Sequence, residues 1–247
     1  PQISLVAEPM TILGALAAVG CGLGVIVLLS RMYMAQIYDM IIVRMTARWY
    51  AVVLDRLPAS SLLLDVGIGT ASALARNAPT VLAKRLRVVG IDYEAPYITC
   101  AEGVVREAGL AGAVSVHCKS IYDPKLASLC PTSRGNTAEK FDAAYFSGSL
   151  TVLPDPVAAL RVSAELLKPS GQIYITQTFQ NQPSPLAQLV KPMLRWITTI
   201  DFGTVTYHSQ VQGLVEQAGL KVLQDEPIPG SINTRYQTAR LIVVGAA

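Results

Sequence analysis

Two acidic residues and two glycines stand where apolar segments of the chain end. Residues 62–66 form an apolar run that contains Asp65, and Gly67 and Gly69 follow directly. A second apolar run ends in Asp92. Glycines let the backbone turn tightly and approach a ligand, and an acid that closes the second strand can accept hydrogen bonds from ribose hydroxyls. This spacing predicts a nucleoside-binding site.

The residues around these glycines discriminate between two cofactor classes. A dinucleotide site requires G-x-G-x-x-G, and Ser72 occupies the third glycine position here. Asp65 would repel a pyrophosphate, whereas it would attract the ammonium group of S-adenosylmethionine, which carries a ribose but no phosphate. We therefore expect S-adenosylmethionine as the cofactor. A nicotinamide cofactor and a plain turn without a ligand are the alternatives.

The elements that position these residues follow from alternating apolar and helical segments. Strands are expected at residues 61–66, 87–91, 114–118, 141–146, 172–178, 220–224 and 239–244, and helices at 70–85, 95–108, 156–167 and 209–218. Alternation of this kind predicts an α/β fold, with a doubly wound, mostly parallel sheet covered by helices on both faces. The acids and glycines then lie at the carboxyl edge of the sheet, where such folds bind ligands.

Several motifs resemble those of the class I S-adenosylmethionine-dependent methyltransferases, over about residues 50–245. The matching segments are 65–69, Asp92, 140–147, 166–173 and 217–220. The resemblance implies a seven-stranded Rossmann-like sheet with an antiparallel last strand, and S-adenosylmethionine as the cofactor. The implied cofactor-binding residues are Asp65, Gly67, Gly69, Thr70, Asp92, Tyr93, Ser120, Ile121 and Ser147. Two positions depart from the family pattern: Ala71 replaces the third glycine, and Ser120 stands where an acid often contacts the adenine.

Methyl transfer demands little from side chains, because the sulfonium is already activated and alignment supplies most of the effect. A base helps only when the nucleophile is a protonated hydroxyl. Tyr145 and His208 are the candidate catalytic residues. The Asn-Pro-Pro-Tyr signature of amino-methylating enzymes is absent, which favours methylation of oxygen, carbon or a small molecule.

The charged residues of the 247-residue chain are unevenly placed, because residues 1–30 contain only Glu8. The 18 residues Ile12–Leu29 are apolar and long enough to predict a transmembrane helix; a signal peptide and a buried core helix are the alternatives. Basic residues begin at Arg31, so the bulk of the chain is expected on the cytosolic, matrix or stromal side of a cellular or organellar membrane. Gly20 and Gly24 predict contact with other membrane helices.

Other function classes are disfavoured by composition. A net charge of +3 is too small to indicate a nucleic-acid partner. The four cysteines and two histidines show no metal-ligand spacing, so no metal site is expected.

These observations predict three parts. Residues 1–30 carry the transmembrane helix (about 10–30), residues 31–58 an amphipathic linker helix, and residues 59–247 a methyltransferase-like domain with an inserted lid at 179–208. The leading hypothesis is a membrane-anchored methyltransferase that acts on a small lipid-like or quinone-like acceptor. The alternative is a non-catalytic accessory subunit or assembly factor of a membrane complex.

Overall fold

The computed structural model describes residues 22, 42–130, 139–182 and 206–246. The expected transmembrane segment, its Gly20 and Gly24, and most of the expected lid at 179–208 lie outside these residues. Within the described part of the chain, no helix combines the length and apolar character needed to cross a membrane.

The described chain is built on one seven-stranded sheet with the order β3-β2-β1-β4-β5-β7-β6. The strands are β1 (Leu62–Val66), β2 (Arg87–Asp92), β3 (Val114–Cys118), β4 (Phe141–Ser147), β5 (Leu167–Gln180), β6 (Leu220–Pro227) and β7 (Gln237–Ala246). The pairs among the first five strands are parallel, and β7 is antiparallel to both β5 and β6. The predicted mostly parallel sheet with an antiparallel last strand is confirmed.

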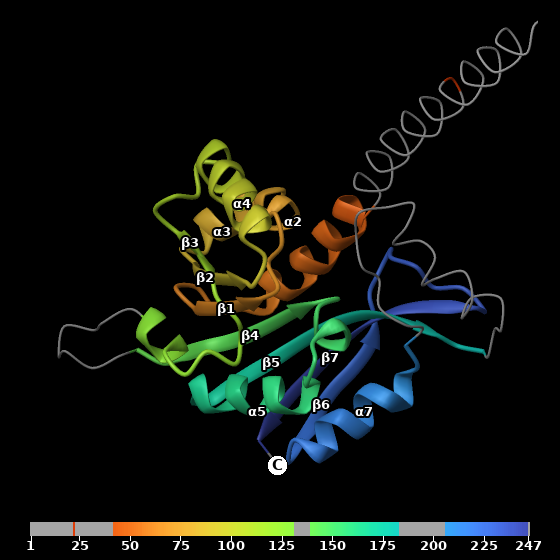
Figure 1. Ribbon diagram of the computed structural model, residues 1–247. Coiled ribbons are helices and arrows are strands. Elements are labelled where there is room, and N and C mark those ends of the chain that lie inside the picture. The colour runs from red at the N-terminus through yellow and green to blue at the C-terminus, as the bar shows by residue number, and fades with distance from the viewer. Residues whose placement is uncertain (1–21, 23–41, 131–138, 183–205, 247) are drawn as a thin grey trace, which may run out of the picture.

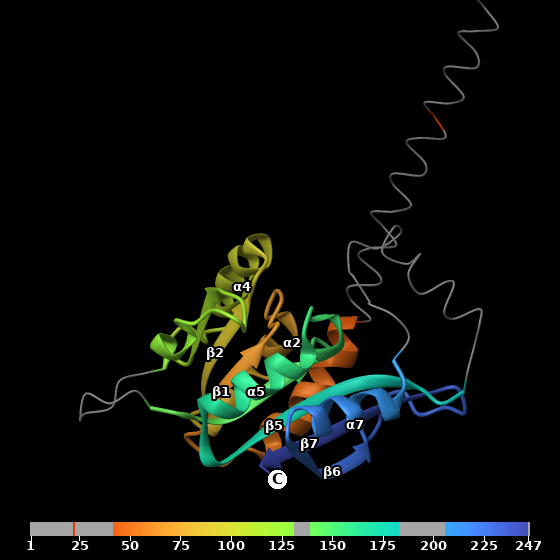
Figure 2. The ribbon, with the colours of Figure 1, turned by 60° about the horizontal axis from the view of Figure 1, so that its bottom comes forward.

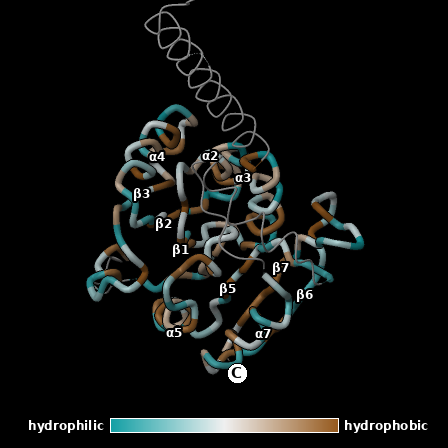
Figure 3. Tube along the Cα trace, turned by 45° about the vertical axis from the view of Figure 1, so that its right-hand side comes forward, coloured by the Kyte–Doolittle hydropathy of each residue, from teal (hydrophilic) through white to brown (hydrophobic). Residues whose placement is uncertain are grey.

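Helices cover both faces of the sheet (Figure 1). They are a helix over residues 42–56, α2 (Ser72–Ala75), α3 (Ala78–Ala83), α4 (Ala95–Glu107), α5 (Pro156–Leu166) and α7 (His208–Gln217), with short 3-10 turns η1 (Leu126–Leu129) and η2 (Leu150–Val152). The helix over residues 42–56 and α2 to α4 share one hydrophobic cluster. The other cluster holds α5 and α7, which Figure 2 shows together on the opposite face. Brown, hydrophobic stretches of β5 and β7 run through the interior between these layers (Figure 3).

The helix over residues 42–56 is packed into the core of the domain. Trp49, Tyr50, Val53 and Leu54 are each at most 3% exposed, and their spacing places them on one helix face. The helix ends just before Pro58, because the residue that precedes a proline disfavours helical geometry. The expected linker helix therefore shares its core with the residues that follow it.

The structure differs from the expected elements at one helix. The segment 70–85, expected to be continuous, is divided into α2 and α3. Pro79 lies at the start of α3, where its missing N–H is tolerated, whereas inside a continuous helix it would break a hydrogen bond. The Asn77 side chain at the junction donates to the carbonyls of Ala47 and Ala73, at 2.9 and 3.0 Å. Asn77 thereby connects α2 to the helix over residues 42–56.

Candidate cofactor site

The glycine-rich turn after β1 lies at the carboxyl edge of the sheet. The N–H groups of Gly67 and Ile68 both donate to the Ile91 carbonyl, at 2.8 and 3.1 Å, and so tie the turn to β2. Gly67 and Gly69 have positive φ angles of 78° and 57°, which glycine adopts without a steric cost. Ala71 also has a positive φ of 57°, so the turn keeps its shape where the family often has a third glycine.

Close packing around the turn explains why residues 67 and 90 are glycines. A Cβ atom on Gly67 would lie 2.6 Å from the Ser149 Cβ, and the Ser149 hydroxyl donates to the Val66 carbonyl. A Cβ atom on Gly90 would lie 2.4 Å from the Ile68 Cδ1. Sequence reasoning gave no role to Gly90, although a glycine inside a strand signals a close approach of neighbouring groups.

Asp92 fixes the turn from the neighbouring strand. Its Oδ2 accepts the Gly69 N–H at 3.0 Å, and its Oδ1 accepts the Glu94 N–H at 3.0 Å. Burial raises the pKa of Asp92, and these backbone N–H groups oppose the rise because they stabilise the ionised form. Each carboxylate oxygen has a further lone pair, so Asp92 can still accept hydrogen bonds from a ligand.

Asp65 is fully buried at the same edge. The Tyr50 hydroxyl donates to its Oδ2 at 2.7 Å, while its Oδ1 has no hydrogen-bond partner among the described residues. Burial raises the pKa of Asp65 to about 7, the Tyr50 hydrogen bond lowers it, and the charge of Asp92 raises it. An unpaired buried carboxylate oxygen is costly, so it marks a place for a hydrogen-bond donor.

The residues present fit S-adenosylmethionine. Asp65, the next-to-last residue of β1, and Asp92, the last residue of β2, supply two acidic side chains, which suit an ammonium group and ribose hydroxyls. A Cβ atom on Gly69 would meet nothing within 4 Å, which leaves open space beside the turn. Asp65, which lies two residues before Gly67, would repel the pyrophosphate of a dinucleotide. The two acidic hydrogen-bond acceptors at this edge therefore match the cofactor expected from the sequence.

The other predicted cofactor-binding residues differ in their exposure and in their hydrogen bonds. Thr70 pairs its hydroxyl with that of Ser72 at 2.8 Å. Tyr93, directly after Asp92, is 70% exposed. Ser120 accepts the N–H of Tyr122 at 3.3 Å.

The last two predicted cofactor-binding residues lie in a loop after β3 and at the end of β4. Ile121 is packed inside the cluster shared with α5 and α7. Ser147 is the last residue of β4 and is paired in register with Thr176 of β5.

The two catalytic candidates are both engaged in contacts of their own. Tyr145 is fully buried, and its hydroxyl lies 2.9 Å from that of Thr176. Burial raises its pKa well above the ordinary value, so it stays protonated at neutral pH. His208 begins α7 and pairs with Asp225, whose other oxygen accepts from Arg240 at 2.6 Å. Tyr145 is therefore no base at neutral pH, whereas a histidine paired with a carboxylate can accept a proton through its other ring nitrogen.

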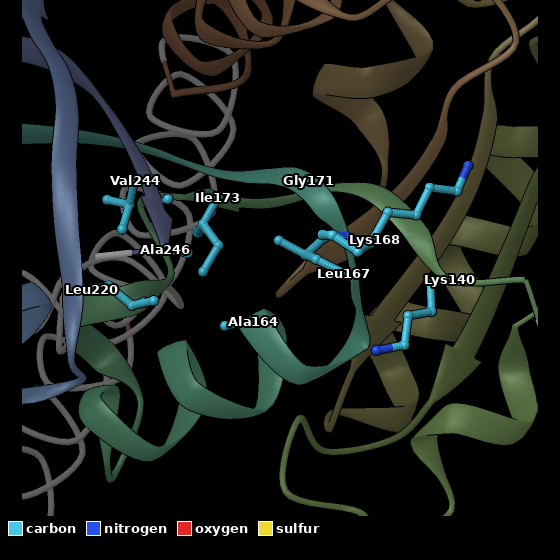
Figure 4. Close-up of a pocket in the computed structure, with 11 residues that line it drawn as sticks. Lys140, Ala164, Leu167, Lys168, Gly171, Ile173, Leu220, Val244 and Ala246 are labelled. Atoms are coloured by element: carbon cyan, nitrogen blue, oxygen red, sulfur yellow. The ribbon is translucent and has the colours of Figure 1, made fainter.

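A cavity lies at the opposite, amino edge of the sheet. It has a volume of about 260 Å³, and Figure 4 shows Ala164, Ile173, Leu220 and Val244 around it. The two lysines that line it are already engaged. Lys140 donates to the Glu165 carbonyl and Lys168 to the Asp142 carboxylate. The cavity is therefore separate from the site at the carboxyl edge.

One protein-family model matches most of this chain. The model described as "Methyltransferase domain" matches residues 36–225. The matched range starts before the helix over residues 42–56 and includes the glycine-rich turn and both acids.

A curated relative and two solved structures are similar to this chain. The phosphatidylethanolamine N-methyltransferase of Cereibacter sphaeroides is 24% identical over 180 residues, which span 71% of this chain and 79% of the relative. The [4+2]-cyclase SpnF superposes with a TM-score of 0.59 at 19% identity, covering 81% of each chain. The O-methyltransferase NcsB1 from neocarzinostatin biosynthesis, solved with S-adenosylmethionine and 2-hydroxy-5-methyl naphthoic acid, superposes with a TM-score of 0.55 at 20% identity. That match covers 80% of this chain and 53% of NcsB1.

Proposed function

This chain belongs to the methyltransferase domain family, and we propose that it methylates the amine headgroup of a membrane lipid. The chain is an S-adenosylmethionine-dependent methyltransferase. When bound, the cofactor supplies a methyl group that is already activated by a positively charged sulfur. The protein's own contribution is to bind, orient and exclude water. Asp92 and Asp65 take the binding role, and the rigid glycine-rich turn takes the orienting role.

The observation that carries the choice of acceptor is the similarity to the curated phosphatidylethanolamine N-methyltransferase, and the two candidate bases bear on how a proton leaves the acceptor. Tyr145 is protonated and buried, and His208 is paired with Asp225. A hydroxyl acceptor needs a base in the transition state. An amine headgroup is protonated at neutral pH, so it too must lose a proton before its nitrogen can attack the methyl group. His208, held by Asp225, is the candidate acceptor of that proton.

The curated relative supports the same acceptor class. Its name states that it methylates the nitrogen of phosphatidylethanolamine. The missing Asn-Pro-Pro-Tyr signature pointed toward oxygen or carbon, but it is a single motif. The name of the relative, whose match spans 71% of this chain, favours a nitrogen acceptor. A lipid substrate also accords with the apolar segment at residues 12–29.

The membrane part of the proposal rests on the sequence. Residues 12–29 would anchor the chain, and the basic residues from Arg31 onward would hold the catalytic domain on the cytosolic, matrix or stromal side. Gly20 and Gly24 would offer a small-residue face to other membrane helices. An anchored domain meets its lipid substrate at the bilayer surface, where the headgroups lie.

Transfer of a labelled methyl group tests this function. The full chain would be incubated with methyl-labelled S-adenosylmethionine and vesicles of phosphatidylcholine containing phosphatidylethanolamine. We expect label in the lipid fraction, and none with vesicles of phosphatidylcholine alone, whose nitrogen is already fully methylated. Label that appears only when the vesicles contain a hydroxylated quinone in place of phosphatidylethanolamine would overturn the amine assignment. Flotation of the full chain with the vesicles tests the anchor.

A further inference from the structure

The helix over residues 42–56 reaches into the cofactor site through one buried contact. The Tyr50 hydroxyl donates to the Asp65 Oδ2 at 2.7 Å, and both side chains are almost fully buried. The Tyr50 ring also meets the Tyr145 ring edge-on, with the ring centroids 4.9 Å apart. These contacts fix the Tyr50 hydroxyl from two sides, so the hydrogen bond has a defined direction.

Other residues of the helix over residues 42–56 keep Tyr50 in its buried position. The neighbouring Trp49 is 3% exposed, and its indole N–H donates to the Ser231 hydroxyl at 3.0 Å. One turn further on, Leu54 is fully buried. Tyr50 is therefore carried by a rigid element that packs on the sheet, and its hydroxyl has little freedom to leave Asp65.

The groups that face Asp65 shift its pKa in opposite directions. Tyr50 comes from the helix over residues 42–56, Asp92 from β2 and Tyr145 from β4. Burial and the charge of Asp92 disfavour the ionised carboxylate, while the Tyr50 hydrogen bond favours it. Tyr145 turns its hydroxyl toward Thr176 instead. The Tyr50 hydrogen bond is thus the contact that keeps Asp65 available as an anion.

We propose that Tyr50 is a positioning residue for the cofactor: its hydroxyl holds the Asp65 Oδ2 and leaves the Oδ1 for the cofactor's ammonium group. The helix over residues 42–56 is then part of the cofactor site as well as of the core. This inference rests on S-adenosylmethionine as the cofactor and does not depend on the identity of the methyl acceptor. Its consequence is a specific pH dependence of cofactor binding, because only the ionised Asp65 attracts an ammonium group.

Titration of S-adenosylhomocysteine into the full chain by calorimetry, from pH 6 to pH 8.5, tests the role of Tyr50. In the wild type, affinity should fall as the pH drops below about 7, where Asp65 becomes protonated. In Tyr50→Phe, the loss of a hydrogen bond to a charged group should move this fall up by roughly one pH unit. The variant should bind about tenfold more weakly than the wild type at pH 6.5 and nearly equally at pH 8.5. Titration of the ligand itself is common to all variants and cancels in this comparison.

Two further variants make the result specific. Tyr174→Phe removes another buried tyrosine hydroxyl, one that donates to Gln172 at 3.0 Å, and its pH profile should match that of the wild type. Asp65→Asn should bind weakly at every pH, without the fall near pH 7. A Tyr50→Phe profile that overlays the wild type, or that is lowered equally at all pH values, would overturn the positioning role. Absence of binding by the wild type would instead overturn the cofactor assignment.

Discussion

Replacing Asp65 with asparagine should stabilise the ligand-free protein at alkaline pH while it weakens cofactor binding. Burial raises the pKa of Asp65 from its ordinary value of 3.8 to about 7 in the folded chain. The folded state therefore holds a proton that the unfolded state has already released. Stability from this group is complete below about pH 4 and is lost as the pH rises through 7. The difference between the two pKa values corresponds to roughly 4 kcal/mol.

Urea unfolding of the full chain in detergent, followed by circular dichroism, measures this effect. Between pH 5 and pH 8 the wild type should lose roughly 2 to 3 kcal/mol because of Asp65 alone. Asp65→Asn has no charge to bury, so the stability difference between variant and wild type should grow by that amount. Asp123→Asn is the matched control, because Lys119 lowers the pKa of this partly exposed carboxylate and its removal gives no gain. A stability difference for Asp65→Asn that is equal at both pH values would refute the reasoning.

Two further predictions concern the turn and the first helix. Gly67→Ala should cost about 1 to 3 kcal/mol, because its positive φ and the Ser149 contact both oppose a side chain. Gly69→Ala, which meets no neighbouring atom, should cost about 1 kcal/mol; equal midpoints in urea for the two variants would contradict this. Leu54→Ala should lower stability by about 2 to 5 kcal/mol, measured in the same way, because Leu54 is fully buried. A smaller loss would mean that the helix over residues 42–56 is not integral to the domain.

The sheet and its acidic edge were predictable from local patterns. Parallel strands buried on both faces give short apolar runs, and Asp65 and Asp92 stand out because they end such runs. The break at Pro79 was also readable, since proline is tolerated in the first turn of a helix but not in its interior.

The contacts that complete the site were not predictable in this way. Tyr50 reaches Asp65 from another element, and Ser149 packs on Gly67 from 82 residues further along the chain. Such contacts depend on how separate elements pack in three dimensions, which residue periodicity does not encode. His208 illustrates the same limit, because its partner Asp225 lies on β6 and no sequence pattern links the two.

Calorimetric titration of S-adenosylhomocysteine into the wild-type chain and into Asp92→Asn tests the central claim most directly. The claim is that the edge formed by Asp65, the glycine-rich turn and Asp92 binds the methyl donor. Saturable binding of one ligand per chain is predicted, with affinity at least about tenfold weaker in Asp92→Asn because an acceptor to the ribose is lost. No binding at millimolar ligand, or equal affinities for the two proteins, would contradict the claim.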